Sequence, residues 1–262
     1  MKVAFLHFHP VMASARLRGY IPEAALRRLG VKQGRDVLIV SKHSWPDSAV
    51  EGFGKIIFDV CDDHFHDMHE AHYRKWVERA DLVTCNSQPM ADLIWMECQR
   101  MATVIPDPYE SPERPASVGN PPLWFGHSAN WPDVEPLLEV LPNLVCVTNK
   151  QHPRATPWSP GAMERAFNRC GIVLIPTGRN QAKSANRAIE SIRNGLYPCT
   201  GRMPAYDDLG LGTDDVVAEM RQRLGDQDET IERIQFLQSM VEARFNPLAI
   251  GRLWKKAVES LC

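Results

Sequence analysis

Short apolar runs alternate with two-faced, helix-length stretches along most of the chain. The runs are too short for helices, which is typical of strands buried on both faces of a parallel sheet. The longer stretches place their apolar residues at helical spacing, which predicts amphipathic helices. We therefore predict an α/β protein with parallel sheets flanked by helices. The expected strands are 3–8, 36–40, 55–60, 82–86, 103–106, 123–126, 144–148, 172–175 and 196–200, and the expected helices are 15–29, 67–80, 87–100, 134–141, 160–169, 182–194, 229–244 and 247–261.

A proline-rich segment divides the chain. Six prolines lie between Pro106 and Pro122, and such a segment cannot continue a helix or a central strand, because proline lacks the amide hydrogen. We expect an N-terminal domain over 1–108, a hinge over 109–122 and a C-terminal domain over 123–245. A final helix over 246–262 begins with Asn246 as N-cap and Pro247 as its first residue.

Composition narrows the functional class. The chain has 262 residues, of which 44% are hydrophobic and 24% charged, as in ordinary globular proteins. A net charge of −2 gives no overall field that would hold the protein on nucleic acid or on an anionic membrane, although a local basic patch is compatible with it. There is no membrane-length apolar run and no recognisable secretion signal, so we expect a cytoplasmic protein without stable membrane insertion. The seven cysteines contain no Cys-x-x-Cys pair, and we interpret them as reduced core residues.

The segment 172–200 is the most informative part of the sequence. A buried strand ends at Pro176, a polar turn follows, and a helix is expected from Ala182 to Asn194. Gly195 ends that helix as its C-cap, after which the chain is extended again. Such β-loop-α-β units bind ligands at the carboxyl end of the first strand.

Three cations, Arg179, Lys183 and Arg187, gather around the expected start of this helix. The partial positive charge of a helix N-terminus disfavours cations. A bound anion would resolve the conflict, and phosphate is the best candidate because backbone N–H groups and basic side chains both bind it. The alternative is a solvated helix face without a ligand.

The end of the same helix resembles the donor-binding signature of GT-B glycosyltransferases, in particular the retaining group called family four. Glu190 and Gly195 match the Glu-x-x-x-x-Gly part of that signature, and Pro198 follows Gly195 one residue later than the proline of its Gly-x-Pro end. In the family, the glutamate that matches Glu190 holds the ribose hydroxyls of a nucleotide-sugar, and the basic residue that matches Lys183 lies near the diphosphate. The first glutamate of the signature, which orients the sugar, is replaced here by Ala182.

The resemblance extends to residues 81–87, 104–108 and 125–128 and so covers most of the chain. It implies two Rossmann-like domains, with the donor held mainly by the C-terminal domain and the acceptor by the N-terminal one. It also implies that the final helix crosses back to the N-terminal domain and that the chemistry needs no metal and no cofactor beyond the donor substrate.

Several expected strand ends of the C-terminal domain carry polar or cationic residues. Because the carboxyl ends of parallel strands share one edge of a sheet, we expect these residues to form a donor pocket. Lys183 and Arg179 are the candidate catalytic cations, since charge builds up on the departing diphosphate in the transition state. The candidates for donor binding are Gly126, His127, Ser128, Lys150, Thr177, Gly178, Asn186, Arg187 and Glu190.

In the N-terminal domain, the loop after the first strand also faces the carboxyl edge of a sheet. It carries His7, His9, Arg16 and Arg18, of which His9, Arg16 and Arg18 are candidates for acceptor binding. Guanidinium groups bind oxyanions through paired hydrogen bonds. The alternative is an exposed basic helix start.

Residues 59–66 follow another strand of that domain. Asp62 is a candidate acceptor ligand and Asp63 a candidate catalytic base. His64 is the candidate for the histidine that contacts the sugar in the retaining relatives. In an inverting reaction, a carboxylate or an imidazole at this place removes the acceptor proton. The alternative is a polar strand end in which Asp63 or Asp67 caps the next helix.

The same stretch permits a different class of enzyme. Residues 62–72 contain four histidines and three aspartates, which are enough ligands for a metal-dependent hydrolase. The spacing does not fit a known array: His69 and His72 are one residue too close for His-Glu-x-x-His. We therefore predict no metal site among the functional residues and keep the hydrolase as an alternative.

The sequence as a whole predicts a metal-independent glycosyltransferase. It moves a sugar from a nucleotide-sugar donor, such as a UDP-sugar, to an acceptor hydroxyl, with retention of configuration. Candidate acceptors are a glycan, a lipid-linked sugar, a protein or a hydroxymethylated pyrimidine of DNA. A non-catalytic nucleotide-sugar-binding module is a further alternative, suggested by Ala182.

Overall fold

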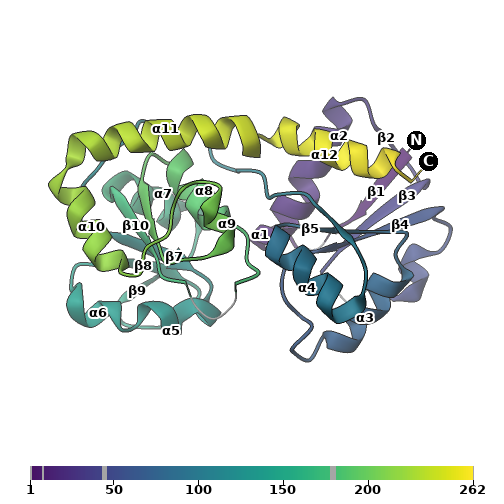
Figure 1. Cartoon of the computed structure of the whole chain (residues 1–262), viewed down its shortest axis with the longest axis horizontal. Helices are drawn as coiled ribbons and strands as arrows, with labels where there is room; N and C mark the ends of the chain where they lie inside the picture. Colours follow the sequence, from purple (N-terminus) through teal and green to yellow (C-terminus); the bar gives the residue numbers. More distant parts are fainter. Residues whose placement is uncertain (1, 8, 43–45, 178–180, 262) are drawn as a thin grey trace. The chain divides into compact units, whose positions relative to one another are not determined.

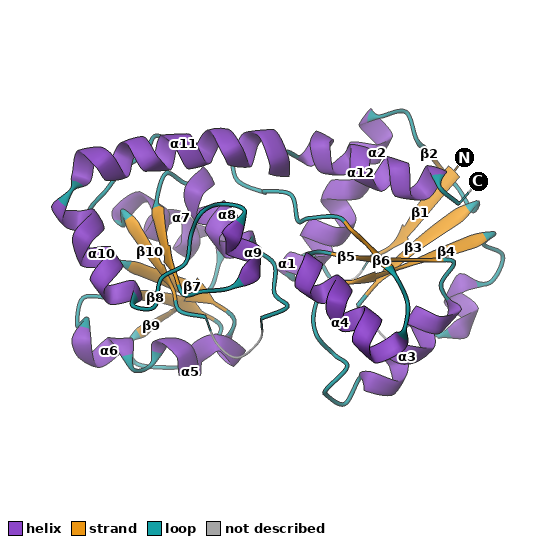
Figure 2. Cartoon of the chain, viewed as in Figure 1, coloured by secondary structure: helices purple, strands orange, loops and turns teal. Residues whose placement is uncertain are grey.

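The computed structural model describes residues 2–7, 9–42, 46–177 and 181–261. Within them the chain forms two parallel sheets, each flanked by helices (Figures 1 and 2). It divides into two compact units, and each is described by itself. The first unit comprises Met1–Tyr109, Ala182–Ser184 and Ala243–Cys262, and the second comprises Glu110–Gln181 and Ala185–Glu242.

The first unit contains a sheet with the strand order β2-β1-β3-β4-β5-β6, and all neighbouring strands are parallel. Parallel neighbours require crossover connections, and helices supply most of them. The strands are β1 (Lys2–Leu6), β2 (Lys32–Gln33), β3 (Val37–Ser41), β4 (Lys55–Val60), β5 (Leu82–Cys85) and β6 (Ala102–Val104).

Alternate residues of β3 face opposite sides of this sheet. Val37 and Ile39 pack with Trp254 of helix α12 (Pro247–Glu259), whereas Leu38 and Val40 belong to the cluster that contains Trp76 of helix α3 (Glu70–Arg79). The sheet is therefore buried on both faces, which explains its continuous apolar runs. The helical elements are α1 (Ala13–Ala15), the π-helical η1 (Arg16–Tyr20), α2 (Ile21–Arg28), η2 (Asp47–Val50), α3 (Glu70–Arg79), α4 (Gln88–Cys98) and α12 (Pro247–Glu259).

The second unit contains a sheet with the strand order β11-β10-β7-β8-β9, again parallel throughout. Its strands are β7 (Leu123–Gly126), β8 (Val145–Thr148), β9 (Ala155–Pro157), β10 (Ile172–Ile175) and β11 (Tyr197–Thr200). Its helical elements are η3 (Ser128–Asn130), α5 (Trp131–Val134), α6 (Leu137–Val140), α7 (Pro160–Arg169), α8 (Asn186–Arg193), α9 (Pro204–Asp207), α10 (Val216–Gly225) and α11 (Gln227–Phe245), the last of which ends in the first unit.

The α/β class and the parallel sheets confirm the prediction, while some helix boundaries correct it. The expected helix 134–141 is two short helices, α5 and α6, because Pro136 cannot donate a hydrogen bond and interrupts the helix. The expected helix 182–194 begins only at Asn186. The short elements β2, β9 and α9 and the ten-residue helix α10 were not predicted.

Helix α12 packs within the first unit. A Cβ atom added to Gly251 would lie 2.6 Å from Cβ of Ala25, so α12 and α2 approach closely at this glycine. Trp254 is fully buried in the core beside Val3 and Ile57. The final helix is thus part of the N-terminal core, the arrangement that the family resemblance implies.

Six cysteines, all except Cys262, lie among the described residues and are free thiols. Burial raises the pKa of Cys85 to about 12 and the pKa of Cys146 to about 11, so these thiols are neutral at physiological pH. They behave as core residues, as expected. No helix of the described segments combines the length and the apolar character needed to cross a bilayer.

Candidate functional site

Four strands of the second unit end at one edge of its sheet. They end at Gly126 (β7), Thr148 (β8), Ile175 (β10) and Thr200 (β11), and all run in the same direction. The loops that follow them carry most of the predicted donor residues. In open α/β sheets ligands bind at this carboxyl edge.

Hydrogen bonds from backbone N–H groups to side chains hold the loops that follow β7 and β8. The Ser128 N–H donates to Oδ1 of Asn149 at 2.7 Å, which joins the loop after β7 to the loop after β8. His127 Nδ1 accepts from the Ala129 N–H at 3.1 Å, and the Lys150 N–H donates to Oγ1 of Thr148 at 3.2 Å. The structure therefore brings His127, Ser128 and Lys150 together, as the sequence predicts.

Arg187, in the first turn of α8, extends toward the end of β7. A Cβ atom added to Gly126 would lie 3.3 Å from Nη1 of Arg187 and 3.2 Å from Cζ2 of Trp124. A side chain at position 126 would crowd both groups, so glycine leaves room at this point for the guanidinium. The Arg187 guanidinium therefore lies beside the Gly126 turn, and both residues are among the predicted donor ligands.

One nitrogen of the Arg187 guanidinium has no hydrogen-bond partner among the described residues. Its Nη1 is buried and makes no hydrogen bond to any residue that the structure describes, and the same is true of Nε1 of Trp124. Burial lowers the pKa of Arg187, although Tyr206 and Asp133 act in the opposite direction. Buried polar groups are nearly always paired, and a buried unpaired charge is costly. These unpaired donors form a site suited to an anion.

The start of α8 adds to this field. The N-cap residue, Ala185, offers no side-chain hydrogen bond, so the first N–H groups of α8 have no cap of that kind. Asn186, a predicted donor ligand, is the first residue of the helix and is half-buried. Uncapped N–H groups and the helix dipole favour negative charge.

Glu190 lies one turn after Arg187 on α8. Its carboxylate accepts hydrogen bonds from the Glu110 N–H and from Ser111. Burial raises the pKa of Glu190, partly opposed by these hydrogen bonds. The predicted ribose ligand therefore holds the first residues of the second unit.

The loop after β10 carries the remaining donor candidates. Thr177 donates from Oγ1 to the Arg202 carbonyl at 3.2 Å, and a Cβ atom on Gly201 would meet that hydroxyl at 2.4 Å. The loops after β10 and β11 are therefore in contact. Gly178 and Arg179 lie outside the described residues.

Lys183 is not part of α8, contrary to the expected helix boundaries. It belongs to Ala182–Ser184, three residues that group with the first unit. Ala182 packs in that unit's core, its carbonyl accepts from Ser87 Oγ at 3.3 Å, and Ser184 hydrogen-bonds to Asp107. Contacts with residues far away in the sequence thus hold this segment, and α8 begins only after it, at Asn186.

Arg18 is buried in the first unit, with 1% of its surface exposed. Its guanidinium donates to both Asp59 oxygens, at 3.0 and 2.6 Å, and to Asp107 Oδ1 at 3.1 Å. The Ile105 carbonyl also accepts from it at 2.5 Å, and the guanidinium lies over the ring of Trp254. Its donors are directed to protein groups, so the expected acceptor contact is replaced by a structural role.

Arg16 and His9 organise the loop after β1. Nη1 of Arg16 donates to the carbonyls of Pro10 at 2.8 Å and Val11 at 2.9 Å. His9 Nδ1 accepts from the Val11 N–H at 3.3 Å. Both predicted acceptor ligands therefore hold their own loop in shape.

A pair that the sequence did not predict lies beside this loop. His7 Nε2 is 2.5 Å from Oε2 of Glu23, and the imidazole stacks on Tyr20 with the ring centroids 4.2 Å apart. Gly19 makes this possible, because a Cβ atom there would lie 2.8 Å from Nδ1 of His7. Glu23 lies 16 residues after His7 and belongs to no recognisable motif, so the sequence does not indicate that the two side chains pair.

The acidic residues after β4 form local contacts. Asp62 pairs with Lys42, while Asp63 accepts from the Phe65 N–H at 3.1 Å and from His66 at 3.2 Å. His64 Nδ1 donates to Asp67 at 2.6 Å.

These contacts shape the turn before α3, but neither Asp63 nor Asp67 is the N-cap of that helix: the N-cap is His69, whose side chain makes no capping hydrogen bond. Asp67 also accepts from the His69 N–H at 2.7 Å. Within the described part of the chain, no three His, Cys, Asp or Glu side chains are arranged to hold a metal ion. The structure gives the hydrolase alternative no support.

Neither a family model nor a curated protein matches the sequence. Solved structures do match. T4 phage β-glucosyltransferase in complex with UDP-glucose has a TM-score of 0.66 at 11% identity, over 99% of this chain and 100% of that one. HepE from Anabaena, also in complex with UDP-glucose, has a TM-score of 0.66 at 13% identity, over 96% of this chain and 84% of that one. TarM has a TM-score of 0.59 at 8% identity, over 84% of this chain and 54% of its own, so the chain spans about half of TarM.

These neighbours are GT-B glycosyltransferases, and the chain has the GT-B fold of two Rossmann-like domains. Identities this low show the fold alone. The fold confirms the architecture predicted from the Glu190 signature.

Proposed function

We propose that this protein is a glycosyltransferase that takes a sugar from a nucleotide-sugar donor. The donor's pyrophosphate rests at the carboxyl edge of the second unit, against Gly126 and the guanidinium of Arg187. The unpaired, buried Nη1 of Arg187 carries this proposal, because a phosphate oxygen would supply its missing partner and would form a charge-assisted hydrogen bond with it. Two of the structural neighbours were solved with UDP-glucose, which supports a UDP-sugar.

The chemistry follows from the charge of the leaving group. As the bond to the sugar breaks, negative charge grows on the departing diphosphate. Arg187 and the N–H groups at the start of α8 are fixed before the reaction, so they stabilise that charge without reorganising. Lys183 and Arg179 are proposed to add further positive charge, with the acceptor hydroxyl attacking the face that the diphosphate leaves.

Glu190 is proposed to bind the ribose of the donor. Its carboxylate is half-buried, and its position on α8 places it one turn from Arg187. Ribose hydroxyls can replace the N–H of Glu110 and the hydroxyl of Ser111 as its hydrogen-bond donors.

A thermal-shift screen of UDP, GDP, ADP and their glucose conjugates tests the donor site. A ligand that binds only the folded state at a hundredfold excess over its Kd adds about 2.7 kcal/mol, or roughly 5 °C for a chain of this size. We expect such a shift for at least one nucleoside diphosphate, unchanged by EDTA because the proposed reaction needs no metal. If no nucleotide stabilises the protein, the proposal fails, and stabilisation that EDTA abolishes would restore the metal-dependent alternative.

Slow hydrolysis of the donor in the absence of acceptor separates an enzyme from a binding module. We expect release of free sugar from the stabilising nucleotide-sugar. Binding without any release over a day would favour the non-catalytic module.

DNA is the second candidate acceptor. The phage β-glucosyltransferase, whose structure is described as that of a DNA-modifying enzyme, matches this chain over 99% and its own chain over 100% of their lengths. If the acceptor is DNA, this protein should bind a duplex that contains hydroxymethylcytosine, and its affinity should fall steeply as the salt concentration rises. Salt-independent or undetectable binding would leave a glycan, a lipid-linked sugar or a protein as the acceptor.

A further inference from the structure

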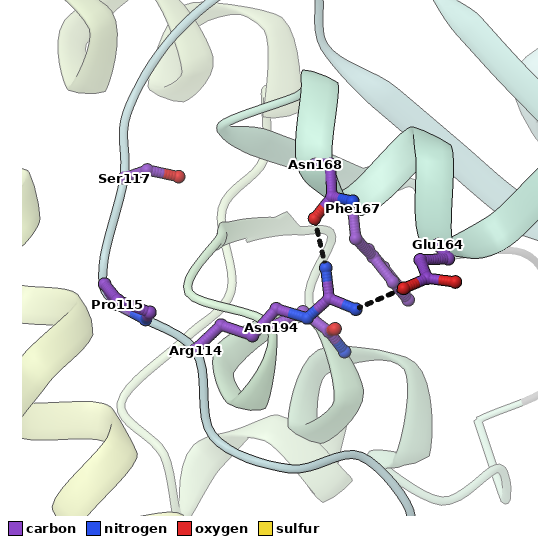
Figure 3. A pocket seen from close by; sticks show the side chains of 7 residues that line it. All are labelled: Arg114, Pro115, Ser117, Glu164, Phe167, Asn168 and Asn194. Atoms are coloured by element: carbon purple, nitrogen blue, oxygen red, sulfur yellow. Dashed lines mark hydrogen bonds and ion pairs between the residues drawn. The ribbon is translucent and has the colours of Figure 1, made fainter.

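A hollow lies in the second unit (Figure 3), and none of the residues proposed to bind the donor lines it. Its volume is about 330 Å³. It is bounded by α7, by the chain segment 114–117 and by the residue that follows α8. The lining residues are Arg114, Pro115, Ser117, Glu164, Phe167, Asn168 and Asn194.

This hollow lies at the opposite edge of the sheet from the proposed donor site. Phe167 and Asn168 are in the last turn of α7, shortly before β10 begins at Ile172. Asn194 likewise precedes β11, which begins at Tyr197. Residues just before parallel strands lie at the amino edge of the sheet, whereas Gly126 lies at the carboxyl edge.

The walls of the hollow are held in place. The Arg114 N–H donates to the Arg193 carbonyl at 2.9 Å, and the Arg114 carbonyl accepts from Gln238 at 2.7 Å. The Ser117 N–H donates to the Gly195 carbonyl at 2.9 Å. Because these hydrogen bonds already hold the lining segments in place, ligand binding should cost little conformational entropy in them.

The polar lining is balanced in charge. The guanidinium of Arg114 donates to Oδ1 of Asn168 and lies 4.0 Å from Oε1 of Glu164 (Figure 3). Together with the amide of Asn194 and the hydroxyl of Ser117, these groups offer both donors and acceptors without net charge. Such a lining favours a neutral ligand rich in hydroxyls over an anion such as a nucleotide.

The apolar part of the lining fits the same ligand. Phe167 packs edge-on against Phe125, with the ring centroids 5.5 Å apart, so its orientation is fixed. Phe167 and Pro115 can cover the C–H face of a sugar ring while the amides bind its hydroxyls. The volume is at the lower end of small-molecule sites and suits one or two sugar units.

We propose that this hollow binds a saccharide, as a site separate from the donor pocket. The ligand class is a neutral mono- or disaccharide unit, either free or part of a longer glycan. The site does not depend on sugar transfer at the carboxyl edge, because the two sites share none of the residues named for them.

Titration of the full chain with cellobiose, maltose, lactose and diacetylchitobiose, followed by NMR of the side-chain amides, tests the proposal. We expect at least one disaccharide to shift the Asn168 and Asn194 signals with a millimolar Kd. Asn168→Ala and Ser117→Ala should each weaken that binding at least tenfold, since both side chains are exposed and line the hollow. Asn143→Ala, an exposed asparagine of the same unit outside the hollow, should bind as the parent does.

Nucleotide binding is followed in the same samples. UDP should bind the Asn168→Ala variant unchanged, so failure of the saccharide site and failure of the donor site give different results. If none of the disaccharides shifts either amide, or if both lining variants bind as well as Asn143→Ala, the proposal is overturned.

Discussion

Arg18 and Arg187 are both arginines near the carboxyl edge of a sheet, yet their surroundings differ. Arg18 is paired with Asp59 and Asp107, whereas Nη1 of Arg187 is buried without a partner among the described residues. Both were predicted to be ligand-binding residues, because the sequence shows the charge of a side chain but not which groups surround it in the fold. At the scale of single residues, a buried guanidinium stabilises the fold where protein carboxylates pair with it. It is available to bind a ligand where one of its N–H groups has no such partner.

Arg187→Met separates these roles. Methionine keeps much of the volume and removes the unpaired charge, so we expect the ligand-free protein to keep its stability or gain about 1 kcal/mol. The same change should lower UDP affinity at least tenfold, because a buried charge-assisted hydrogen bond is lost. Urea unfolding and calorimetric titration measure the two effects.

Arg165→Met is the matched control, since Arg165 is exposed on α7 of the same unit. It should change neither quantity. A large loss of stability with unchanged UDP affinity in Arg187→Met would assign Arg187 a purely structural role.

Among the helices, α10 was not predicted, although it has a side-chain N-cap. Its N-cap, Asp215, accepts hydrogen bonds from the Val217 N–H at 2.9 Å and the Ala218 N–H at 3.0 Å. Asp214 and Asp215 adjoin, and the sequence does not say which one is the cap. The helix also lacks a long apolar stripe, and its buried residues are Val216 and Met220.

Replacing the cap should weaken this helix measurably. Asp215→Ala removes the acceptor of two backbone N–H groups, and loss of such a cap costs about 1 kcal/mol. Asp214→Ala is the control, because its ion pair with Arg202 is exposed and contributes little. Equal unfolding midpoints for the two variants in urea would contradict the capping role.

At the scale of the whole molecule, the first unit is discontinuous in sequence. It takes Ala182–Ser184 from the middle of the chain and Ala243–Cys262 from its end. Lys183 therefore belongs to one unit, while Arg187, shortly after it, belongs to the other. Lys183 and Arg187 were predicted to lie together at the start of one helix, but each is held by the residues of a different unit.

Lys183→Ala tests the catalytic role proposed for this lysine. If Lys183 acts on the charge that develops on the leaving diphosphate, its loss should lower kcat at least tenfold and change KM little. Steady-state kinetics on the nucleotide-sugar identified by the thermal-shift screen measures both constants. Lys256→Ala, on the exposed side of α12, should leave both unchanged.

The opposite result is equally informative. A rise in KM with unchanged kcat would mean that Lys183 contributes equally to binding in the ground state and in the transition state. Lys183 would then be a binding residue without a role in the chemical step.

The sequence alone determined the α/β class, the parallel sheets and most strand positions, because apolar runs such as Ile172–Ile175 report local burial directly. It also placed Gly126, Ser128, Lys150 and Arg187 at one sheet edge, since parallel strands end together. Only the tertiary structure decided which charged groups have partners: the Arg18 guanidinium pairs with Asp59 across the fold, and the Glu190 carboxylate accepts a hydrogen bond from the Glu110 N–H. Such pairing depends on distances between residues far apart in the chain, and a linear pattern does not contain them.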